Sequence, residues 1–416
     1  MSIRTLTEKL ARIVSPPPAG VVVASDFAQG GQIVVDICIV TNCAFVGGNA
    51  SSTIAELQAF SAAGLRCIIV HCPVKRSIWK RNWVAERFIP FLAKIVPSHA
   101  VERIECNALI VRGPRMAMTR TFSSFAPRVK ASRALYIVNN SAWSENGKPL
   151  FDWSALHERV AQVGIPRSQI FPISPLVREE AKRSIGSYSG PELLAPYDWP
   201  PAFDTNEFTC PPDKLFRHPI VIGRHGRDHE GKWLEDPTEL LQSYPDAADI
   251  AVNILGGAEV PRRRLGSLPG NWTVLPFGSS GVSNYLSQID VFVYFPSRKR
   301  DEAFGRTVIE AILANKPVIL PHSFASTFGQ LAFYCEPSEV ATIVRRLADD
   351  SIGRIGFVSA ARKEAVVRYG AHALKQRLAD PVHGASYTPA LDDHAEAFRQ
   401  HVMRPLEAEQ NSIHRG

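Results

Sequence analysis

The residues best suited to chemistry are two glutamates, Glu302 and Glu310, in the stretch DVFVYFPSRKRDEAFGRTVIEAILANKPVILP at 290–321. The apolar run that opens this stretch predicts a buried strand, and a helix is predicted over 307–316. Between them, Gly305 lets the backbone approach a ligand closely. A helix amino terminus offers unpaired N–H groups and the positive end of its dipole, which suit a diphosphate. We therefore expect both carboxylates to face one anion-binding cleft.

A second cluster is cationic. Arg224, Arg227 and Lys232 lie in VIGRHGRDHEGKW (221–233), at and after a predicted strand. Positive side chains there can compensate the charge that develops on a departing diphosphate, a task that a metal ion performs in other enzymes. The alternative is that Glu302 and the cations are solvated loop charges and that Glu310 caps a core contact.

These residues need strands and helices to position them. The β-branched run IVVDICIVTNC (33–43) predicts a strand buried on both faces, and the pair Gly47-Gly48 and a helix over 51–64 follow it. Strand, turn, helix and strand in succession form the parallel βαβ unit. Further strands are predicted at 65–72, 108–113, 134–139, 170–174, 219–227, 249–257, 272–277, 290–295 and 317–321.

The order of these elements predicts two doubly wound α/β domains. Prolines and aromatic residues crowd 191–219, which we interpret as the link between them. The predicted boundaries are an amino-terminal Rossmann-like acceptor domain at 1–195, a linker at 196–218 and a Rossmann-like donor domain at 219–370. Helices over 371–416 are expected to cross back to the amino-terminal domain.

The composition is that of a globular protein, with 416 residues, 45% of them hydrophobic and 21% charged. No apolar run is long enough to span a membrane, and the amino terminus lacks the apolar core of a signal peptide. The predicted location is the cytoplasm. The seven cysteines form no CxxC pair and no zinc-ligand spacing, so neither a metal nor a cofactor is predicted.

The positive charge lies in the amino-terminal half. Residues 1–200 contain 23 Lys and Arg against 14 Asp and Glu, whereas 201–416 contain 24 against 26. Such asymmetry predicts different partners for the two halves. No nucleic-acid-binding motif is present, so nucleic acid is not expected as a partner. An anionic membrane surface or a phosphorylated acceptor fits the basic half.

The spacing of Glu302 and Glu310, with the glycine turn between them and NKPVI after them, resembles the Glu-x7-Glu motif of the retaining GT-B glycosyltransferases of family four. The resemblance extends over roughly 33–370 and is most specific in the carboxyl-terminal half. It implies a GT-B fold, two facing Rossmann-like domains with parallel sheets and a cleft between them. It also implies that Glu302 contacts hydroxyls of a donor sugar and that Glu310 binds the ribose of its nucleotide. The family usually has EGFG where this chain has EAFG.

The same resemblance implies that Arg224 and Lys232 bind the donor phosphates without a metal ion, with Glu302 as the third catalytic residue. Eight positions separate the two cations, more than is usual in the family, so whether Lys232 or Arg227 is the second cation stays open. The other residues implied in binding a UDP- or GDP-sugar are Gly305, Arg306, Thr307, Val308, Phe277 and Gly278. The last two belong to an expected base pocket of backbone groups at 275–278.

In the amino-terminal half, TNCAFVGGNAS (41–51) resembles the family's glycine loop. The resemblance implies that Gly47, Gly48 and Asn49 face the donor phosphates or the acceptor. Many relatives have a histidine where this chain has Asn139 and Asn140, which can bind hydrogen-bonding groups but cannot act as bases. The implied mechanism is front-face attack, in which the departing phosphate takes the acceptor's proton. His71 is an alternative base or a structural residue.

Tryptophan, phenylalanine, lysine and arginine mingle in SIWKRNWVAERFIPFLAKIV (77–96). Such a stretch can lie in a membrane interface or pack its aromatic rings on the protein's own core. The first reading predicts peripheral contact with the inner face of the cell membrane.

The predicted function is that of a retaining hexosyltransferase acting on a glycan, lipid-linked or other hydroxyl acceptor, as in polysaccharide or cell-envelope biosynthesis. A nucleotide-sugar epimerase on the same fold is one alternative. It requires an acid–base pair that Asn139 and Asn140 do not supply. A catalytically inactive glycan-assembly subunit is the other alternative.

Overall fold

The structure is a computed structural model that describes residues 28–29, 32–44, 47–74, 83–144, 147–185, 193–212, 215–299, 302–379 and 391–404. Part of the 77–96 segment lies outside these residues. The chain divides into two compact units, which are described separately. Of the described residues, unit 1 contains those up to Asn139 together with 151–171 and 193–195. Unit 2 contains 140–144, 147–150 and 172–185 together with those from Pro196 onward.

Unit 1 is built on a sheet with the strand order β4-β3-β2-β5-β6-β7, and β1 pairs with β2 in an antiparallel hairpin. Its strands are β1 Ala28–Gln29, β2 Gln32–Thr41, β3 Cys67–His71, β4 Ile95–Pro97, β5 Arg103–Arg112, β6 Val129–Val138 and β7 Ser168–Pro172. Its helices are α2 Gly48–Ala62, α3 Pro114–Ala117, α4 Arg120–Phe125, α5 Trp153–Val163 and the 3₁₀ helices η3 Glu86–Lys94 and η4 Ala126–Arg128. The chain leaves β2 first toward β3 and later toward β5. The switch point of the sheet, where ligands bind in open α/β sheets, therefore lies between β2 and β5.

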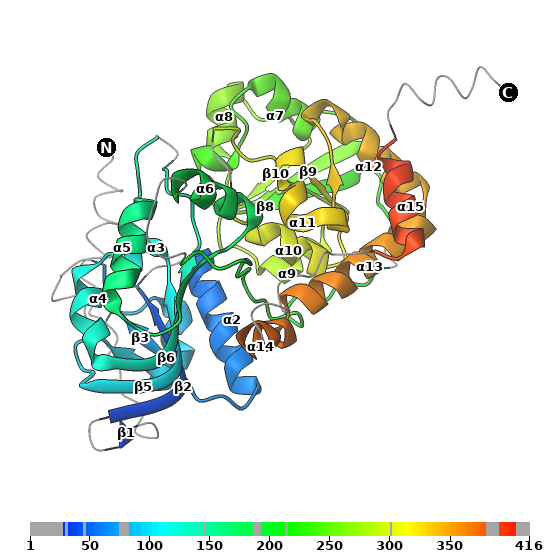
Figure 1. The fold of residues 1–416 in the computed structure, drawn as a ribbon. Coiled ribbons are helices and arrows are strands. Elements are labelled where there is room, and N and C mark those ends of the chain that lie inside the picture. The colour runs from blue at the N-terminus through cyan, green and yellow to red at the C-terminus, as the bar shows by residue number, and fades with distance from the viewer. Residues whose placement is uncertain are drawn as a thin grey trace. The chain divides into compact units, whose positions relative to one another are not determined.

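Unit 2 is built on a second sheet, with the order β10-β9-β8-β11-β12-β13 and every neighbouring pair parallel. Its strands are β8 Ile220–His225, β9 Ile250–Leu255, β10 Trp272–Leu275, β11 Val291–Val293, β12 Val318–Leu320 and β13 Phe333–Tyr334. Its helices are α6 Pro175–Ile185, α7 Pro237–Ser243, α8 Glu259–Leu265, α9 Val282–Ser287, α10 Arg306–Leu313, α11 Ala325–Phe328, α12 Val340–Asp349, α13 Ser351–Tyr369, α14 Ala371–Ala379 and α15 Asp393–Val402, with short 3₁₀ turns η5 Glu230–Lys232, η6 His322–Phe324, η7 Gly329–Leu331 and η8 Pro337–Glu339. Figure 1 shows α13 and α15 side by side at the end of this unit. The switch point here lies between β8 and β11.

The pairing of β8 and β11 depends on a glycine. Gly223 pairs with Phe292, and a Cβ at Gly223 would lie only 2.5 Å from Ile289 Cγ2 and 2.6 Å from Tyr285 Oη. Tyr285 Oη donates to backbone carbonyls of β8 and β9, at Arg224 and Asn253. The missing side chain therefore lets a buried tyrosine brace the strand that leads into the switch point.

The α/β class and the two Rossmann-like units are confirmed, and a strand occurs at each predicted strand segment. β5 and β6 begin five residues earlier than predicted, because their first halves alternate between exposed and buried positions instead of forming apolar runs. The two- and three-residue strands β13 and β4 were not predicted. The domain boundaries remain predictions, as does the crossing of the final helices; α14 and α15 contact α13 in unit 2.

Candidate functional site

The switch point of unit 2 brings together residues that are far apart in the sequence. Arg224 and His225 end β8, the residues after β11 lead to Glu302, and Gly305 precedes α10. These are the carboxyl ends of adjacent parallel strands, which is where open sheets bind their ligands. The predicted anionic and cationic clusters therefore belong to one site.

Glu302 is held by two donors. Lys232 Nζ lies 2.5 Å from its Oε1, and Tyr294 Oη donates to its Oε2 at 2.5 Å. The Glu302 side chain is 17% exposed and that of Lys232 is 28% exposed. Because the pair keeps contact with solvent, a ligand can reach both charges.

Glu310 lies in the first turn and a half of α10, beside Arg306. Arg306 Nε is 3.1 Å from Glu310 Oε1, and His225 Nε2 is 3.4 Å from Oε2. Burial, and then the nearby Arg224 charge, lower the pKa of His225 to about 3. The imidazole is therefore neutral at physiological pH, and the charge beside Glu310 comes from Arg306.

Gly305 begins α10 with the left-handed backbone conformation, φ +81°. A Cβ there would lie 3.1 Å from the Phe324 ring. Gly305, the residue that precedes the helix, has no side chain with which to cap it, and a helix amino terminus of this kind suits an anion. Thr307 is half-buried at this end, whereas Val308 packs in the core.

Arg224 is buried, with 1% exposure, inside a cage of aromatic rings. Its guanidinium carbon lies 3.6 Å from the ring centroid of Trp233, 5.1 Å from that of Tyr294 and 5.9 Å from that of Tyr244. Nη1 also donates to the Lys232 carbonyl at 2.6 Å. Arg224 thus shapes the loop that carries Lys232, and it can touch a phosphate only by leaving this cage.

Arg227, by contrast, is exposed. Within the described part of the chain, no hydrogen bond or ion pair involves its side chain. It follows β8 by two residues and lies in the same loop as Lys232. Arg227 is therefore the cation of this loop that is most accessible to an anionic ligand.

The loop between β8 and α7 is fastened to its surroundings at several points. The Asp228 carboxylate accepts from Trp233 Nε1 at 3.0 Å and from the Glu259 and Val260 N–H groups at the start of α8. Glu235 accepts from Ser297 Oγ and from the Arg298 N–H, in the loop that leads to Glu302. The two loops therefore hold each other, and Lys232 and Glu302 meet for this reason.

The predicted base pocket follows β10. Phe277 is 68% exposed, and Gly278 has a φ of +79° with open space where a Cβ would be. The segment presents an accessible ring and backbone. Its part in binding a base remains a prediction.

In unit 1 the structure brings Asn49 and Asn139 together, with Asn139 Nδ2 donating to Asn49 Oδ1 at 2.8 Å. Gly47 and Gly48 lie immediately before, at the start of α2. Asn140 donates to the Ser141 carbonyl and belongs to unit 2 by its contacts. His71 is buried, and its Nδ1 accepts from the Cys43 N–H at 3.1 Å, which is a structural role.

The 77–96 segment is described from Trp83 onward. It contains the 3₁₀ helix η3, with Phe88 buried and Ile89 43% exposed. Membrane contact through this segment remains a prediction. Among the described residues, no helix is both long and apolar enough to cross a bilayer.

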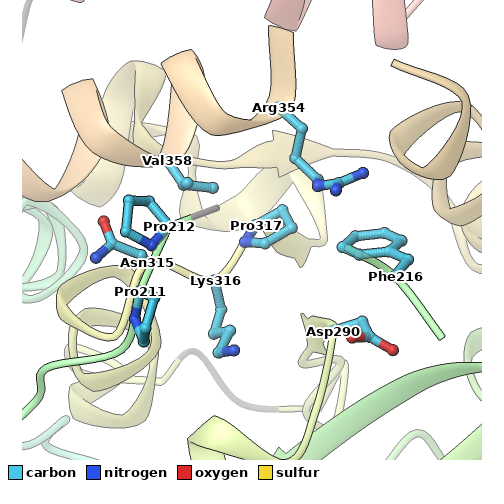
Figure 2. A pocket seen from close by; sticks show the side chains of 9 residues that line it. All are labelled: Pro211, Pro212, Phe216, Asp290, Asn315, Lys316, Pro317, Arg354 and Val358. Atoms are coloured by element: carbon cyan, nitrogen blue, oxygen red, sulfur yellow. The ribbon is translucent and has the colours of Figure 1, made fainter. Parts of the chain in front are cut away.

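A small cavity in unit 2 lies away from these residues (Figure 2). Asp290 and Pro317, in its wall, directly precede β11 and β12, so the cavity is at the amino edge of the sheet. Its volume is about 10 Å³, which is room for about one water molecule. It cannot hold a nucleotide.

Sequence reasoning missed three contributors to the site: Tyr294, His225 and the ring cage of Arg224. An aromatic residue at the end of an apolar strand looks like core, and Tyr294 is indeed buried. Its hydroxyl becomes informative only once Glu302 is placed beside it. Among the described residues, no group of three or more His, Cys, Asp or Glu is arranged to hold a metal ion.

The sequence matches no protein-family model and no curated protein. Solved structures are similar in fold. Anabaena HepE in complex with UDP and glucose has a TM-score of 0.59 and 15% identity, over 84% of this chain and 99% of that one. A glycosyltransferase from Rickettsia africae has a TM-score of 0.55 and 13% identity, over 83% and 97%.

A third similar structure is an α-glucosyltransferase in complex with UDP and a 13-mer DNA that contains an HMU base. Its TM-score is 0.56 and its identity 11%, over 83% of this chain and 99% of that one. That glucosyltransferase was solved with DNA bound. The comparisons therefore do not support the expectation that this chain has no nucleic-acid partner. The similarity of all three structures over most of their length shows that this chain has the GT-B fold.

Proposed function

We propose that the protein is a glycosyltransferase that uses a nucleoside-diphosphate sugar, bound at the switch point of unit 2. The observation that carries the proposal is the pairing of Lys232 with Glu302, 70 residues apart in the sequence, close in the chain to Gly305 and the start of α10. A carboxylate for sugar hydroxyls, a cation and a helix amino terminus for phosphates are the groups that such a donor requires. The solved structures with bound UDP support the choice of donor.

We assign Glu302 to hydroxyls of the donor sugar and Glu310 to the ribose. Arg227 and Lys232 bind the diphosphate, since Arg227 is accessible whereas Arg224 is enclosed by rings. Arg224 supports them by shaping the loop. This arrangement differs from the one that the resemblance implies: Arg227 replaces Arg224 as a phosphate-binding cation, and Lys232 is retained as the other.

We further propose transfer with retention of configuration and without a metal ion. The two cations and the α10 amino terminus compensate the charge on the leaving diphosphate as the glycosidic bond breaks. The acceptor hydroxyl attacks the anomeric carbon from the face that the diphosphate leaves, and its proton passes to the phosphate oxygen. No protein base is needed in this scheme.

A thermal-shift screen with UDP-, GDP-, ADP- and dTDP-sugars tests the proposal, because a ligand that binds the folded state raises the melting temperature by mass action. One nucleotide series is expected to stabilise the protein. Slow hydrolysis of the same donor without acceptor then separates an active transferase from an inactive subunit. The configuration of the released sugar, observed by NMR, tests retention. Absence of stabilisation by any nucleotide would contradict the proposal.

A further inference from the structure

The switch point of unit 1 contains a buried ion pair. Arg112, the last residue of β5, binds Glu56 of α2 through Nη1, and the two side chains are 1% and 0% exposed. Replacing a buried ion pair by apolar residues of similar size often leaves stability unchanged or improves it. Stability alone therefore does not account for these two charges, and their other contacts indicate what they hold.

Arg112 also holds the amide of Asn49. Its Nε donates to Asn49 Oδ1 at 3.1 Å, and Asn139 Nδ2 donates to the same oxygen at 2.8 Å. Asn49 Nδ2 in turn donates to Thr41 Oγ1 at 3.1 Å. Both ends of the Asn49 amide are thus fixed, which determines which end of Asn139 can meet it.

Asn139 must turn its nitrogen toward Asn49, because Asn49 Oδ1 accepts only from a donor. The Asn139 carbonyl oxygen then remains for another partner. Among the residues that the structure describes, no donor bonds to this oxygen, and Asn139 is half-buried, so a ligand can reach it. Gly113 is the neighbour of this oxygen, since a Cβ there would lie 3.4 Å away, at ordinary van der Waals contact.

We propose that Asn139 Oδ1 accepts a hydrogen bond from a carbohydrate hydroxyl, and that Arg112 and Glu56 are positioning residues that orient it through Asn49. The inference rests on the proposed function. Thr41, Arg112 and Asn139 end or follow β2, β5 and β6, so the oxygen lies at the switch point of unit 1. The hydroxyl belongs to the donor sugar or to the acceptor, and the experiment distinguishes them.

The first test compares wild type with Asn139→Ala. We expect about a tenfold fall in kcat/KM, the value of one hydrogen bond, with unchanged affinity for the nucleoside diphosphate in calorimetry. If the hydroxyl is the donor's, donor hydrolysis and transfer both slow; if it is the acceptor's, only transfer slows. Deoxy substrates are tested on both proteins. With wild type, kcat/KM should be about tenfold lower for the analogue that lacks the bound hydroxyl than for the parent substrate. With Asn139→Ala, kcat/KM should be the same for the two substrates.

The second test uses the positioning residues. The double variant Arg112→Met/Glu56→Met should fold and show the same loss in kcat/KM and the same insensitivity to the deoxy analogue. Arg112→Lys, which keeps the charge but lacks the Nε donor, should show the same loss in kcat/KM and the same insensitivity as the double variant. The control is Glu105→Met/Lys130→Met, an exposed ion pair nearer the amino ends of β5 and β6, which should retain wild-type rates.

Two outcomes would overturn the inference. One is wild-type kcat/KM in the folded Arg112→Met/Glu56→Met variant. The other is a loss in Asn139→Ala that is the same for every deoxy substrate. Nucleotide binding by the wild type tests the proposed function separately: its absence removes both conclusions, whereas binding with unaltered rates in these variants removes this one alone.

Discussion

At the residue scale, both carboxylate oxygens of Glu302 are held by hydrogen-bond donors. Lys232 and Tyr294 each donate to one of its two oxygens, and Tyr294 is itself buried. An ionised carboxylate accepts hydrogen bonds and donates none. In the proposed function, Glu302 binds sugar hydroxyls in a fixed orientation and Lys232 binds the adjacent phosphate.

This geometry predicts that Lys232 and Glu302 act as a unit. We expect Lys232→Met and Glu302→Gln each to slow transfer at least a hundredfold, on the order of 3 kcal/mol, and the double variant to be little slower than either. Single-turnover rates at saturating donor measure this. Arg345→Met, which breaks the exposed pair with Asp249 elsewhere in unit 2, is the control. Additive losses would show that the two side chains act independently.

His225 makes stability depend on pH. Its pKa of about 3 in the folded state lies below the ordinary 6.5 because burial disfavours the charged imidazole. Between pH 6.5 and 3 the imidazole is therefore protonated in the unfolded chain but neutral in the folded chain. The free energy of unfolding is unaffected by the titration of His225 above pH 6.5 and decreases as the pH falls from 6.5 toward 3. At pH 4.5 the loss is about 2–3 kcal/mol. Urea unfolding of His225→Leu should show a flatter pH profile between 6.5 and 4.5, and an unchanged slope would contradict the assignment.

The residue types of the site could be predicted from the sequence, but not their surroundings. Glu302 and Glu310 follow from their spacing and from the glycine turn between them. The ring cage around Arg224 does not, because Tyr244 and Tyr294 come from two other segments of the chain. The preference for Arg227 over Arg224 needed the burial of each guanidinium.

At the element scale, the site depends on a loop that α8 holds in place. Asp228 accepts hydrogen bonds from the first N–H groups of α8 and from the Trp233 indole, and Trp233 stacks on Arg224. One carboxylate thus joins a helix start to the cation-bearing loop. A carboxylate at the amino terminus of a helix also interacts favourably with the positive end of the helix dipole.

Asp228→Ala is expected to lower the free energy of unfolding by about 1–3 kcal/mol, because it leaves a helix start and a buried indole without their acceptor. It should also raise the KM for donor, since the loop carries Arg227 and Lys232. Urea titration and steady-state kinetics measure the two effects. Asp246→Ala, an exposed residue of the same unit, is the control. An unchanged KM in Asp228→Ala would mean that the loop needs no anchor.

Strands with continuous apolar runs were predictable because both faces of a parallel sheet are covered. The interlocking of the loops after β8 and β11 was not, because it depends on Glu235 with Ser297 and on Lys232 with Glu302, pairs more than 60 residues apart. Which strands are neighbours decides such contacts. The strand order emerges only from the packed sheet.

At the scale of the whole molecule, both units have the same plan. Each has a series of parallel strands whose switch point lies beside its first strand, β2 in unit 1 and β8 in unit 2, and polar side chains gather at that point. Unit 2 gathers charges of both signs near the start of α10. Unit 1 gathers the amides of Asn49 and Asn139, and the buried ion pair of Arg112 and Glu56 contacts Asn49. This division suits a charged nucleotide in unit 2 and neutral hydroxyls in unit 1.

Metal independence is a prediction for the whole enzyme. In the proposed mechanism Arg227, Lys232 and the α10 amino terminus supply positive charge for the leaving diphosphate, so we expect transfer to stay within about twofold after exhaustive treatment with EDTA. Rates before chelation, after chelation and after addition of Mg²⁺ or Mn²⁺ test this. Loss of turnover that either ion restores would contradict it.

The most direct test of the central claim is calorimetric titration of the nucleoside diphosphate identified by the thermal-shift screen. We expect Glu310→Gln and Arg227→Ala each to weaken binding by about 1.5–3 kcal/mol, the value of a charge-assisted hydrogen bond. Arg217→Ala removes an exposed arginine near the amino end of β8, opposite the site, and should bind as the wild type does. Equal affinity of all four proteins for the nucleotide would contradict a donor site at the switch point of unit 2.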